Sequence, residues 1–493
     1  QKLYGYNGSG RAPLSATLAD MQAAADAHGD GEEIPPFGAA PVSVPGTVDG
    51  WFALHGRFGA LPMSDNLQPT IDYARNGAPI PEVIAYYWGR NAARLAEAHE
   101  SGMLEEFDNA RRTFFDPAPR EGSLFRNPDL ADTLSTIAAQ GRDAFYTGSL
   151  ARTMDQYMDR IGGFMGYEDL AAHQGEWIEP VCVTYRDQVK LCELGPNTQG
   201  VAALQMLEML EPFDLRGMGW GSPDAIMAQV EAKRLAFADR ALGYADPAFS
   251  RMPADWYVRD GYNAERGRRI DLSKPLTDVS TTLPKVDIKL GDGDTTYLSV
   301  TDANGMMVSL IQSNYRGMGT GLVPDGLGFM LQDRGQLFSL DADHPNVFEP
   351  GKRPFHTIIP GFAYKNVDGA YQPWLSFGLM GGGMQPQGHV QIILNLIDFD
   401  MGLQEAGDAA RWEHRGGCEP TDTLSGDCEA DLGVIWLESG IPAATRAELE
   451  RRGHTVRCCQ ANGGGYQAIM RDFDSGAWIA ATEMRKDGQA DGY

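Results

Sequence analysis

Two runs typical of β-strands stand close together in the second half of the chain: TTYLSVTD at 295–302 and MMVSLIQS at 306–313. Only Ala-Asn-Gly separates them, and Asn-Gly between such runs is a strong hairpin signal because both residues tolerate positive φ. Symmetric pairing about this turn sets Thr295 opposite Ser313, within about one residue of register. The sequence therefore predicts a hairpin with a hydroxyl group at the start of one strand and another at the end of its partner.

Helical and strand patterns alternate along the rest of the chain. Its 493 residues, 43% of them hydrophobic, can bury the core of one large α/β domain or two smaller ones. The first two hundred residues mix helical and irregular stretches, and a second hairpin begins near Trp177. Two helices follow, in GPNTQGVAALQMLEMLE and GSPDAIMAQVEAKRLAFADRALGYADP. Ser222 is the expected N-cap of the later helix, with Pro223 at the first helical position.

The charge balance argues against several classes of partner. The chain has 67 acidic and 41 basic residues, a formal charge of -26, which repels the phosphates of nucleic acids and anionic membranes. No apolar run approaches the length of a membrane-spanning helix, and the first residues lack the features of a signal peptide. We therefore expect neither a nucleic-acid nor a membrane partner.

Cysteines and histidines form no pattern that indicates a metal site. Cys182 and Cys192 lie in strand-like runs, where a cysteine usually acts as a small buried hydrophobic residue. Two further pairs stand close in sequence: Cys418 with Cys428, across a loop that could carry a local disulfide, and Cys458 with Cys459. The nine histidines have no metal-ligand spacing. We expect no metal and no cofactor, and the cysteine usage favours a reducing, cytoplasmic compartment over the periplasm.

Other catalytic motifs are absent from the sequence. The stretch GMGTGLVPDGLG at 317–328 has the glycines of a phosphate-binding loop but lacks its Lys-Ser/Thr ending and its strand-turn-helix context. No Gly-x-Ser-x-Gly elbow is present, which argues against the serine mechanism of α/β-hydrolases. We interpret 317–328 as a glycine-rich loop near a site.

Thr295 is a candidate nucleophile because of what precedes it. A threonine hydroxyl is activated when the same residue is a chain N-terminus, since its own α-amine can then serve as the base. Thr295 reaches that state only if the Asp294–Thr295 bond is broken. The flexible Gly-Asp-Gly-Asp at 291–294 would let the Asp294 carbonyl approach the hydroxyl. Taken alone, however, this pattern is more often an ordinary start of a strand.

A longer comparison of motifs adds to this interpretation. The stretch TTYLSVTDANGMMVSLIQSNYRGMGTG resembles the start of the small subunit in the γ-glutamyltranspeptidase family. The resemblance continues through GKRPFHTIIP, FGLMGGGMQPQGHVQIILNLIDFDMGLQEAGDAARWEH and KDGQADGY, and upstream through SVPGTVDGW, LGPNTQGVAALQMLEMLE and EAKRLAFADRALGYADP. It implies a four-layer αββα fold of the N-terminal-nucleophile hydrolase type. It also implies self-cleavage into a large fragment, 1–294, and a small fragment, 295–493, which together form one structural domain.

The same resemblance assigns catalytic roles. Thr295 would be the nucleophile of both self-cleavage and catalysis, and Ser313 stands where the family has a threonine that hydrogen-bonds it. Gly381 and Gly382 match the glycines of the oxyanion loop, whose amides could face a developing oxyanion. Thr296 would help to position the new N-terminus.

The departures from the family concern recognition of the glutamyl group. Leu337 replaces the aspartate that binds the donor's α-amino group, and His356 and Thr357 replace a pair of serines. The arginine that binds the α-carboxylate has no counterpart in its motif, which leaves Arg334 and Arg11 as cations that could face the pocket. The glutamyl clamp is thus expected to be missing, and Leu337→Asp is expected to shift activity partly towards glutamyl donors.

We expect an autoprocessed amidase that cleaves a small acyl amide through a threonyl ester. One alternative is a γ-glutamyltransferase or glutathione hydrolase with a rearranged clamp, and another is a catalytically silent binding relative. The retained Thr295, Ser313 and glycine pair count against the silent alternative. Expected partners are the amide substrate and the two fragments themselves, whose pairs could dimerise. Members of the family extend further before the position of Gln1, so the compartment stays undecided.

Overall fold

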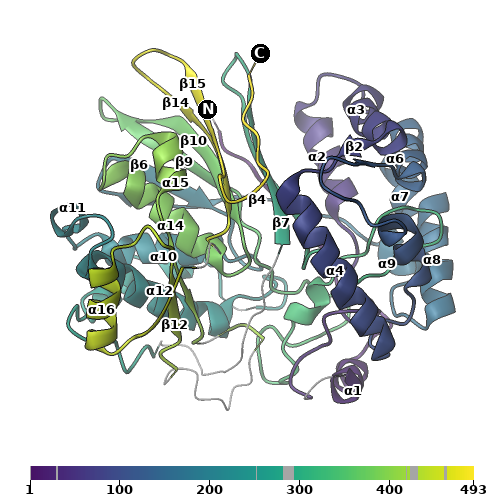
Figure 1. Cartoon of the computed structure of the whole chain (residues 1–493), viewed down its shortest axis with the longest axis horizontal. Helices are drawn as coiled ribbons and strands as arrows, with labels where there is room; N and C mark the ends of the chain where they lie inside the picture. The colour runs from purple at the N-terminus through teal and green to yellow at the C-terminus, as the bar shows by residue number, and fades with distance from the viewer. Residues whose placement is uncertain are drawn as a thin grey trace.

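The computed structural model describes residues 2–28, 31–250, 252–280, 294–417, 419–421, 431–459 and 463–492. The predicted Gly-Asp-Gly lead-in to Asp294 and the Cys418–Cys428 pair lie outside these ranges. Within the described residues, helices and strands mix in an α+β fold (Figure 1).

A six-stranded antiparallel sheet organises one half of the molecule (Figure 1). Its order is β15-β14-β10-β9-β6-β5, and the strands are β5 (Val181–Tyr185), β6 (Val189–Glu193), β9 (Gly361–Val367), β10 (Ala370–Met380), β14 (Gly465–Arg471) and β15 (Trp478–Thr482). Strands β5 and β6 form the hairpin predicted after Trp177. Because β6 pairs with β9, the predicted large and small fragments share this sheet.

Two helices cover one face of the sheet, α10 (Gly200–Leu210) and α14 (Met384–Ile397), and a third, α12 (Pro223–Gly243), packs on α10. The Ser222 hydroxyl accepts a hydrogen bond from the Ala225 amide at 3.1 Å, which confirms the predicted N-cap of α12. Both helices predicted in this part of the sequence are present, and the structure buries almost every side chain of α10 and α12. The reason is that α10 packs against α12, α14 and the sheet at once, while α12 packs against α10, α11 (Leu215–Met218), α16 (Ala443–Arg452) and β11 (Trp412–Arg415).

The hairpin predicted from Asn-Gly is present as β7 (Asp294–Thr301) and β8 (Met307–Tyr315). It lies on the other face of the sheet, as alternate residues of β10 show. The Phe377 ring centroid is 4.7 Å from that of His389 in α14, whereas Gly378 lies directly under the Tyr297 ring of β7. Successive side chains of a strand point to opposite faces, so the sheet separates α14 from the hairpin.

A second group of helices lies beyond the hairpin (Figure 1). It comprises α2 (Thr47–Phe58), α3 (Met63–Asn76), α4 (Glu82–Glu100), α6 (Pro128–Gln140), α7 (Arg142–Tyr146), α8 (Ser149–Ile161) and α9 (Tyr167–Ala171). These helices have their own hydrophobic core, which also contains Leu322, Leu327 and Leu331. The glycine-rich stretch 317–328 of the small fragment is therefore a loop packed into a core built mainly by the large fragment.

The remaining elements are short, apart from α1 and α16. They are β1 (Gly5–Asn7), α1 (Leu18–His28), β2 (Ala78–Pro79), α5 (Asp108–Ala110), η1 (Arg111–Phe115), β3 (Leu124–Phe125), β4 (Glu176–Ile178), α11 (Leu215–Met218), η2 (Ala254–Val258), α13 (Tyr262–Gly267), η3 (Arg334–Leu337), α15 (Leu403–Asp408), β11 (Trp412–Arg415), β12 (Val434–Leu437), α16 (Ala443–Arg452) and β13 (Thr455–Cys458). In the described part of the chain, no helix is long and apolar enough to cross a bilayer.

Among the described residues, two cysteine pairs form disulfides, contrary to the expectation that Cys182 and Cys192 act as separate hydrophobic residues. The register of the β5–β6 hairpin sets Cys182 directly opposite Cys192, which brings their sulfur atoms together. The second disulfide joins the adjacent Cys458 and Cys459. No three His, Cys, Asp or Glu side chains of the described residues are arranged to hold a metal ion.

Candidate active site

Thr295 and Ser313 meet at the open end of the β7–β8 hairpin. The Thr295 hydroxyl donates a hydrogen bond to the Ser313 hydroxyl oxygen at 3.2 Å. That oxygen also accepts from the Tyr315 amide at 2.8 Å, so the backbone fixes its position. A shift in register explains the contact: Thr296 pairs with Gln312 but Asp294 pairs with Tyr315, so Thr295 alone faces two residues of β8. The structure confirms that the two hydroxyl groups are neighbours.

Thr295 is an internal residue of the uncleaved chain. Its side chain is only 7% exposed, and the Asp294 backbone continues β7 ahead of it. The side chain of Asp294 lies outside the described part of the structure. Thr296, the next residue, is exposed and lines a large cavity.

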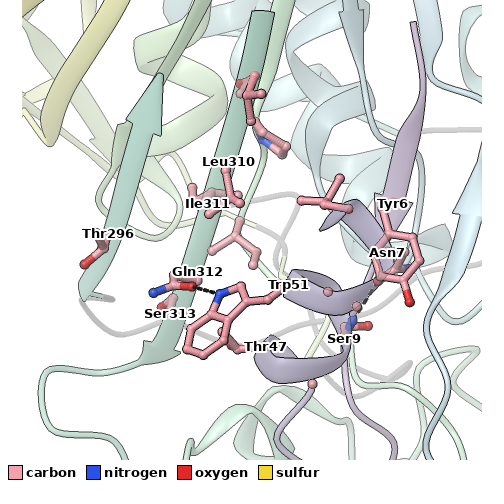
Figure 2. A pocket seen from close by; sticks show the side chains of 18 of the residues that line it. Tyr6, Asn7, Ser9, Thr47, Trp51, Thr296, Leu310, Ile311, Gln312 and Ser313 are labelled. Carbon is pink, nitrogen blue, oxygen red and sulfur yellow. Dashed lines mark hydrogen bonds between the residues drawn. The ribbon is translucent and has the colours of Figure 1, made fainter. Parts of the chain in front are cut away.

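This cavity has a volume of about 1150 Å³ and lies between β8 and α2 (Figure 2). Its wall is largely apolar and includes aromatic side chains such as Trp51, Phe145 and Phe329. Ser313 lines it next to Gln312, whose side-chain oxygen accepts a hydrogen bond from the Trp51 indole at 3.2 Å (Figure 2). A cavity of this size accommodates a small organic molecule.

Arg334 supplies positive charge to the cavity wall. Its side chain is buried, and its two terminal nitrogens, Nη1 and Nη2, make no hydrogen bond within the described residues. Burial lowers the pKa of Arg334 to about 10, so the group is still charged at neutral pH. The Asp333 carboxylate and the Tyr315 ring lie near this charge, but neither accepts a hydrogen bond from Nη1 or Nη2. Buried donors without acceptors are unfavourable, and a bound anion would relieve that cost. Arg334 is therefore suited to hold an anionic group of a ligand.

His356 lines the cavity as well, whereas Thr357 turns away from it. Burial, with the nearby Arg334 charge, holds the pKa of His356 well below its usual value, so the ring is neutral. Its Nδ1 atom has no partner within the described residues. Thr357 is buried, and its carbonyl oxygen accepts a hydrogen bond from the Gln199 side chain.

Arg11 and Leu337 do not reach the cavity, contrary to the sequence-based expectation. Arg11 forms an ion pair with Asp246 at 3.1 Å and also donates to the Gly351 carbonyl. Leu337 is 1% exposed and belongs to the main hydrophobic core. For Leu337 the reason lies in η3, because this short helix presents Arg334 to the cavity and turns Leu337 towards the core.

Gly381 and Gly382 form the turn between β10 and α14. Their φ angles are +124° and +56°, which suit glycine because residues with a side chain rarely adopt such values. Neither residue lines the cavity in the uncleaved chain. The start of β7 nevertheless leads to this turn, because Ser299 contacts Ser376 and Tyr297 covers Gly378. Continued by two residues along both strands, this pattern leads from Thr295 to Met380, the last residue of β10 before the glycine turn.

Sequence patterns did not point to Gln199 or Trp51, although both lie in motifs that carry the family resemblance. Gln199 stands in LGPNTQG and Trp51 in SVPGTVDGW. Their contacts, Gly382 for Gln199 and Gln312 for Trp51, are distant in sequence. A glutamine among turn residues was the only local signal for Gln199.

Comparison with known proteins places this site in a family. The family model of gamma-glutamyltranspeptidase matches residues 1–493. The glutathione hydrolase-like YwrD proenzyme of Bacillus subtilis is 34% identical over 408 residues, which are 83% of this chain and 72% of that protein. The oxamate amidohydrolase proenzyme of Klebsiella pneumoniae is 32% identical over 497 residues, 98% of this chain and 86% of that protein.

Among solved structures, a cephalosporin acylase from Bacillus halodurans superposes with a TM-score of 0.85 and 37% identity. The superposition covers 100% of this chain and 85% of the acylase. The family model and the superposition thus cover the whole chain, and the two relatives cover 83% and 98% of it. The chain belongs to the gamma-glutamyltranspeptidase family and is a hydrolase of its N-terminal-nucleophile type.

Proposed function

We propose that the chain cleaves itself between Asp294 and Thr295 and then hydrolyses a small acyl amide with Thr295 as the nucleophile. In maturation, the Thr295 hydroxyl attacks the Asp294 carbonyl, the acyl group moves from nitrogen to oxygen, and water hydrolyses the resulting ester. The Thr295–Ser313 hydrogen bond supports this step, since it holds the hydroxyl in one orientation.

In catalysis, the Thr295 hydroxyl is again the nucleophile. The Thr295 hydroxyl attacks the amide carbonyl, and the freed α-amine accepts its proton. The amides of Gly381 and Gly382 would stabilise the oxyanion. The C–N bond then breaks, the amine leaves with the proton, and a threonyl ester remains. Water hydrolyses this ester, which releases the carboxylic acid and restores the hydroxyl.

The acyl group that fits best has a carboxylate of its own, and the observation that carries this is the unpaired guanidinium of Arg334. Both terminal nitrogens are buried in the cavity wall, so a carboxylate would bind them side by side only after the guanidinium turns into the cavity. A γ-glutamyl group would add an ammonium ion. In the described lining, Asp302 is engaged by amides of the hairpin turn. Glu193 is 1% exposed: its Oε1 binds His389, and its Oε2 is buried in the wall without a hydrogen-bond partner among the described residues. We therefore propose amides of short dicarboxylic acids as substrates.

Three anilides separate the candidate substrates. Glutaryl and γ-glutamyl anilide differ only by the α-amine, and pentanoyl anilide replaces the distal carboxylate of glutaryl anilide with a methyl group. We expect kcat/KM to be highest for the glutaryl compound, because it offers the carboxylate without the ammonium. Efficient cleavage of γ-glutamyl anilide, about 10⁴ M⁻¹s⁻¹ or more, would favour the second candidate, a glutathione hydrolase like the Bacillus subtilis relative.

Arginine variants test the role of Arg334 directly. Arg334→Met should lower kcat/KM for glutaryl anilide about 10- to 100-fold, the loss expected for hydrogen bonds to a charged group, and leave pentanoyl anilide nearly unchanged. Arg11→Met is the matched control, since Arg11 lies outside the cavity wall. An equal loss for both anilides in Arg334→Met would refute the assignment.

A further inference from the structure

The buried side chain of Gln199 forms a hydrogen bond to the turn of Gly381 and Gly382. The side-chain nitrogen Nε2 of Gln199 donates to the Gly382 carbonyl at 2.8 Å and to the Thr357 carbonyl at 2.7 Å. Gln199 is 0% exposed, so water does not compete for these bonds. One amide group thus links the glycine turn to the segment that carries His356 into the cavity wall.

Arg240 and Glu419 determine how this amide is oriented. The Gln199 side-chain oxygen accepts from Arg240 Nη1 at 2.6 Å, and Arg240 also forms a buried ion pair with Glu419. A guanidinium can only donate hydrogen bonds, so it must face the amide oxygen. The amide nitrogen is therefore forced towards the two carbonyls.

Fixed carbonyls also fix the amides of the turn. In a trans peptide unit, C=O and N–H point in opposite directions. The Met384 amide binds the Gly381 carbonyl at 2.9 Å, which turns the Gly382 N–H away from α14. Gln199 holds the next peptide unit, Gly382–Gly383, whose carbonyl also accepts from the Gln385 amide at 3.2 Å. This unit carries the Gly383 N–H, so Gln199 anchors the turn on the side that directly follows the Gly382 amide. Two glycines have no side chains to restrict them, so these bonds replace what side-chain sterics would otherwise supply.

We propose that Gln199 is a positioning residue for oxyanion binding, oriented by the Arg240–Glu419 pair. This inference rests on the proposed function of the Gly381–Gly382 turn. Gln199 acts through the backbone and touches no substrate. It belongs to the predicted large fragment and the turn to the small one, so the geometry of the oxyanion site depends on both fragments.

Gln199→Met removes the hydrogen bonds to the Gly382 and Thr357 carbonyls and keeps a side chain of similar volume. Gln205→Met is the matched control. Gln205 is equally buried in α10, but its amide nitrogen binds Asp239. We expect Gln199→Met to lower kcat on the order of 10²-fold, comparable to the loss of an oxyanion donor, with little change in KM. The control should keep the wild-type kcat.

Two inhibitors distinguish positioning from general damage. A boronic acid analogue of the acyl group forms a tetrahedral adduct with the Thr295 hydroxyl and needs the oxyanion site, whereas the product acid does not. In Gln199→Met the inhibition constant of the boronate should rise with the loss in kcat, and that of the product should stay constant. An equal rise for both inhibitors, or a kcat within twofold of wild type, would overturn the inference.

If Gln199→Met does not fold or mature, Arg240→Lys provides a milder test. The lysine keeps a positive charge for Glu419 but lacks the guanidinium group that orients the Gln199 amide. Arg240→Lys should therefore lower kcat, as Gln199→Met does. It should also raise the inhibition constant of the boronate and leave that of the product unchanged. Wild-type kcat in that variant would refute the orienting role. The proposed function fails in a different way, namely if the wild-type protein neither cleaves itself at Thr295 nor hydrolyses any of the three anilides.

Discussion

At the scale of single residues, the site depends on hydroxyl, guanidinium and amide groups and on the contacts that orient each of them. Thr295 is oriented by Ser313, and Arg334 has no hydrogen-bond partner for Nη1 and Nη2 within the described residues. Leu337, which stands where the family has an aspartate, lies in the core instead of the cavity. Equivalent positions in a motif therefore do not guarantee equivalent surroundings.

Ser313→Ala should slow both maturation and turnover, because the Thr295 hydroxyl loses its oriented acceptor. The expected loss is about 1 to 3 kcal/mol in activation free energy, typical of one active-site hydrogen bond. Band intensities on a denaturing gel over time measure maturation, and anilide cleavage measures turnover. Thr301→Ala, in the same hairpin but at its exposed turn, should leave both rates unchanged. Unchanged rates in Ser313→Ala would contradict the proposed role.

Leu337→Asp should destabilise the protein and should not create activity on γ-glutamyl donors. The carboxyl group would be buried among apolar side chains without a hydrogen-bond partner, at a cost of several kcal/mol. Thermal unfolding should show a lower Tm, and Leu337→Met, which preserves apolar volume, should stay near wild type. A stable Leu337→Asp protein that cleaves γ-glutamyl anilide would show that this position reaches the substrate after all.

At the scale of elements, α12 is unusual because its charged residues from Glu231 to Arg240 are all buried. Lys233 is 1% exposed and donates to His414 Nδ1 of β11 at 3.0 Å. Burial lowers the pKa of Lys233 to about 7. The folded protein therefore releases this proton at a lower pH than the unfolded chain does.

The pH dependence of stability follows from that shift. Below about pH 7 both states hold the proton, and the folded state bears the full cost of the buried charge. Above pH 7 the unfolded state binds more protons, so Lys233 makes the free energy of unfolding rise with pH, by at most about 1.4 kcal/mol per unit. Lys233→Met should remove this contribution, so denaturant unfolding at pH 7 and 9 should differ less in the variant. The prediction fails if wild type and variant have the same pH dependence.

At the scale of the whole molecule, the two predicted fragments are interlocked. Strand β6 of the large fragment pairs with β9 of the small one, and Leu322, Leu327 and Leu331 of the small fragment pack into the core of the second helix group. Cleavage of one bond at the start of β7 would leave these contacts intact. The fold thus allows maturation without separation of the products.

We accordingly expect two bands on a denaturing gel but one peak in gel filtration. The large fragment should end at Asp294 and the small one should begin at Thr295, as mass spectrometry can verify. Thr295→Ala should remain a single uncleaved chain of the same native size. Separation of the fragments in native buffer would contradict the shared sheet as the element that holds them together.

The sequence by itself determined the local features: the β7–β8 hairpin from its Asn-Gly turn, the Ser222 cap of α12, and the order of motifs that identifies the family. These depend on neighbours in the chain, so a pattern is enough to predict them. The pairing of Thr295 with Ser313 was accessible in the same way, because a hairpin register is set by its turn.

Only the tertiary structure decided which distant residues meet. It placed Arg334 in the cavity wall and Leu337 in the core, although three positions separate them, and it tied Arg11 to Asp246. It also brought Gln199 to Gly382 across 183 positions. Such contacts depend on how the sheet and the helices pack in three dimensions. The periodicity of one segment shows which of its faces is buried, but it does not show which other segment packs against that face.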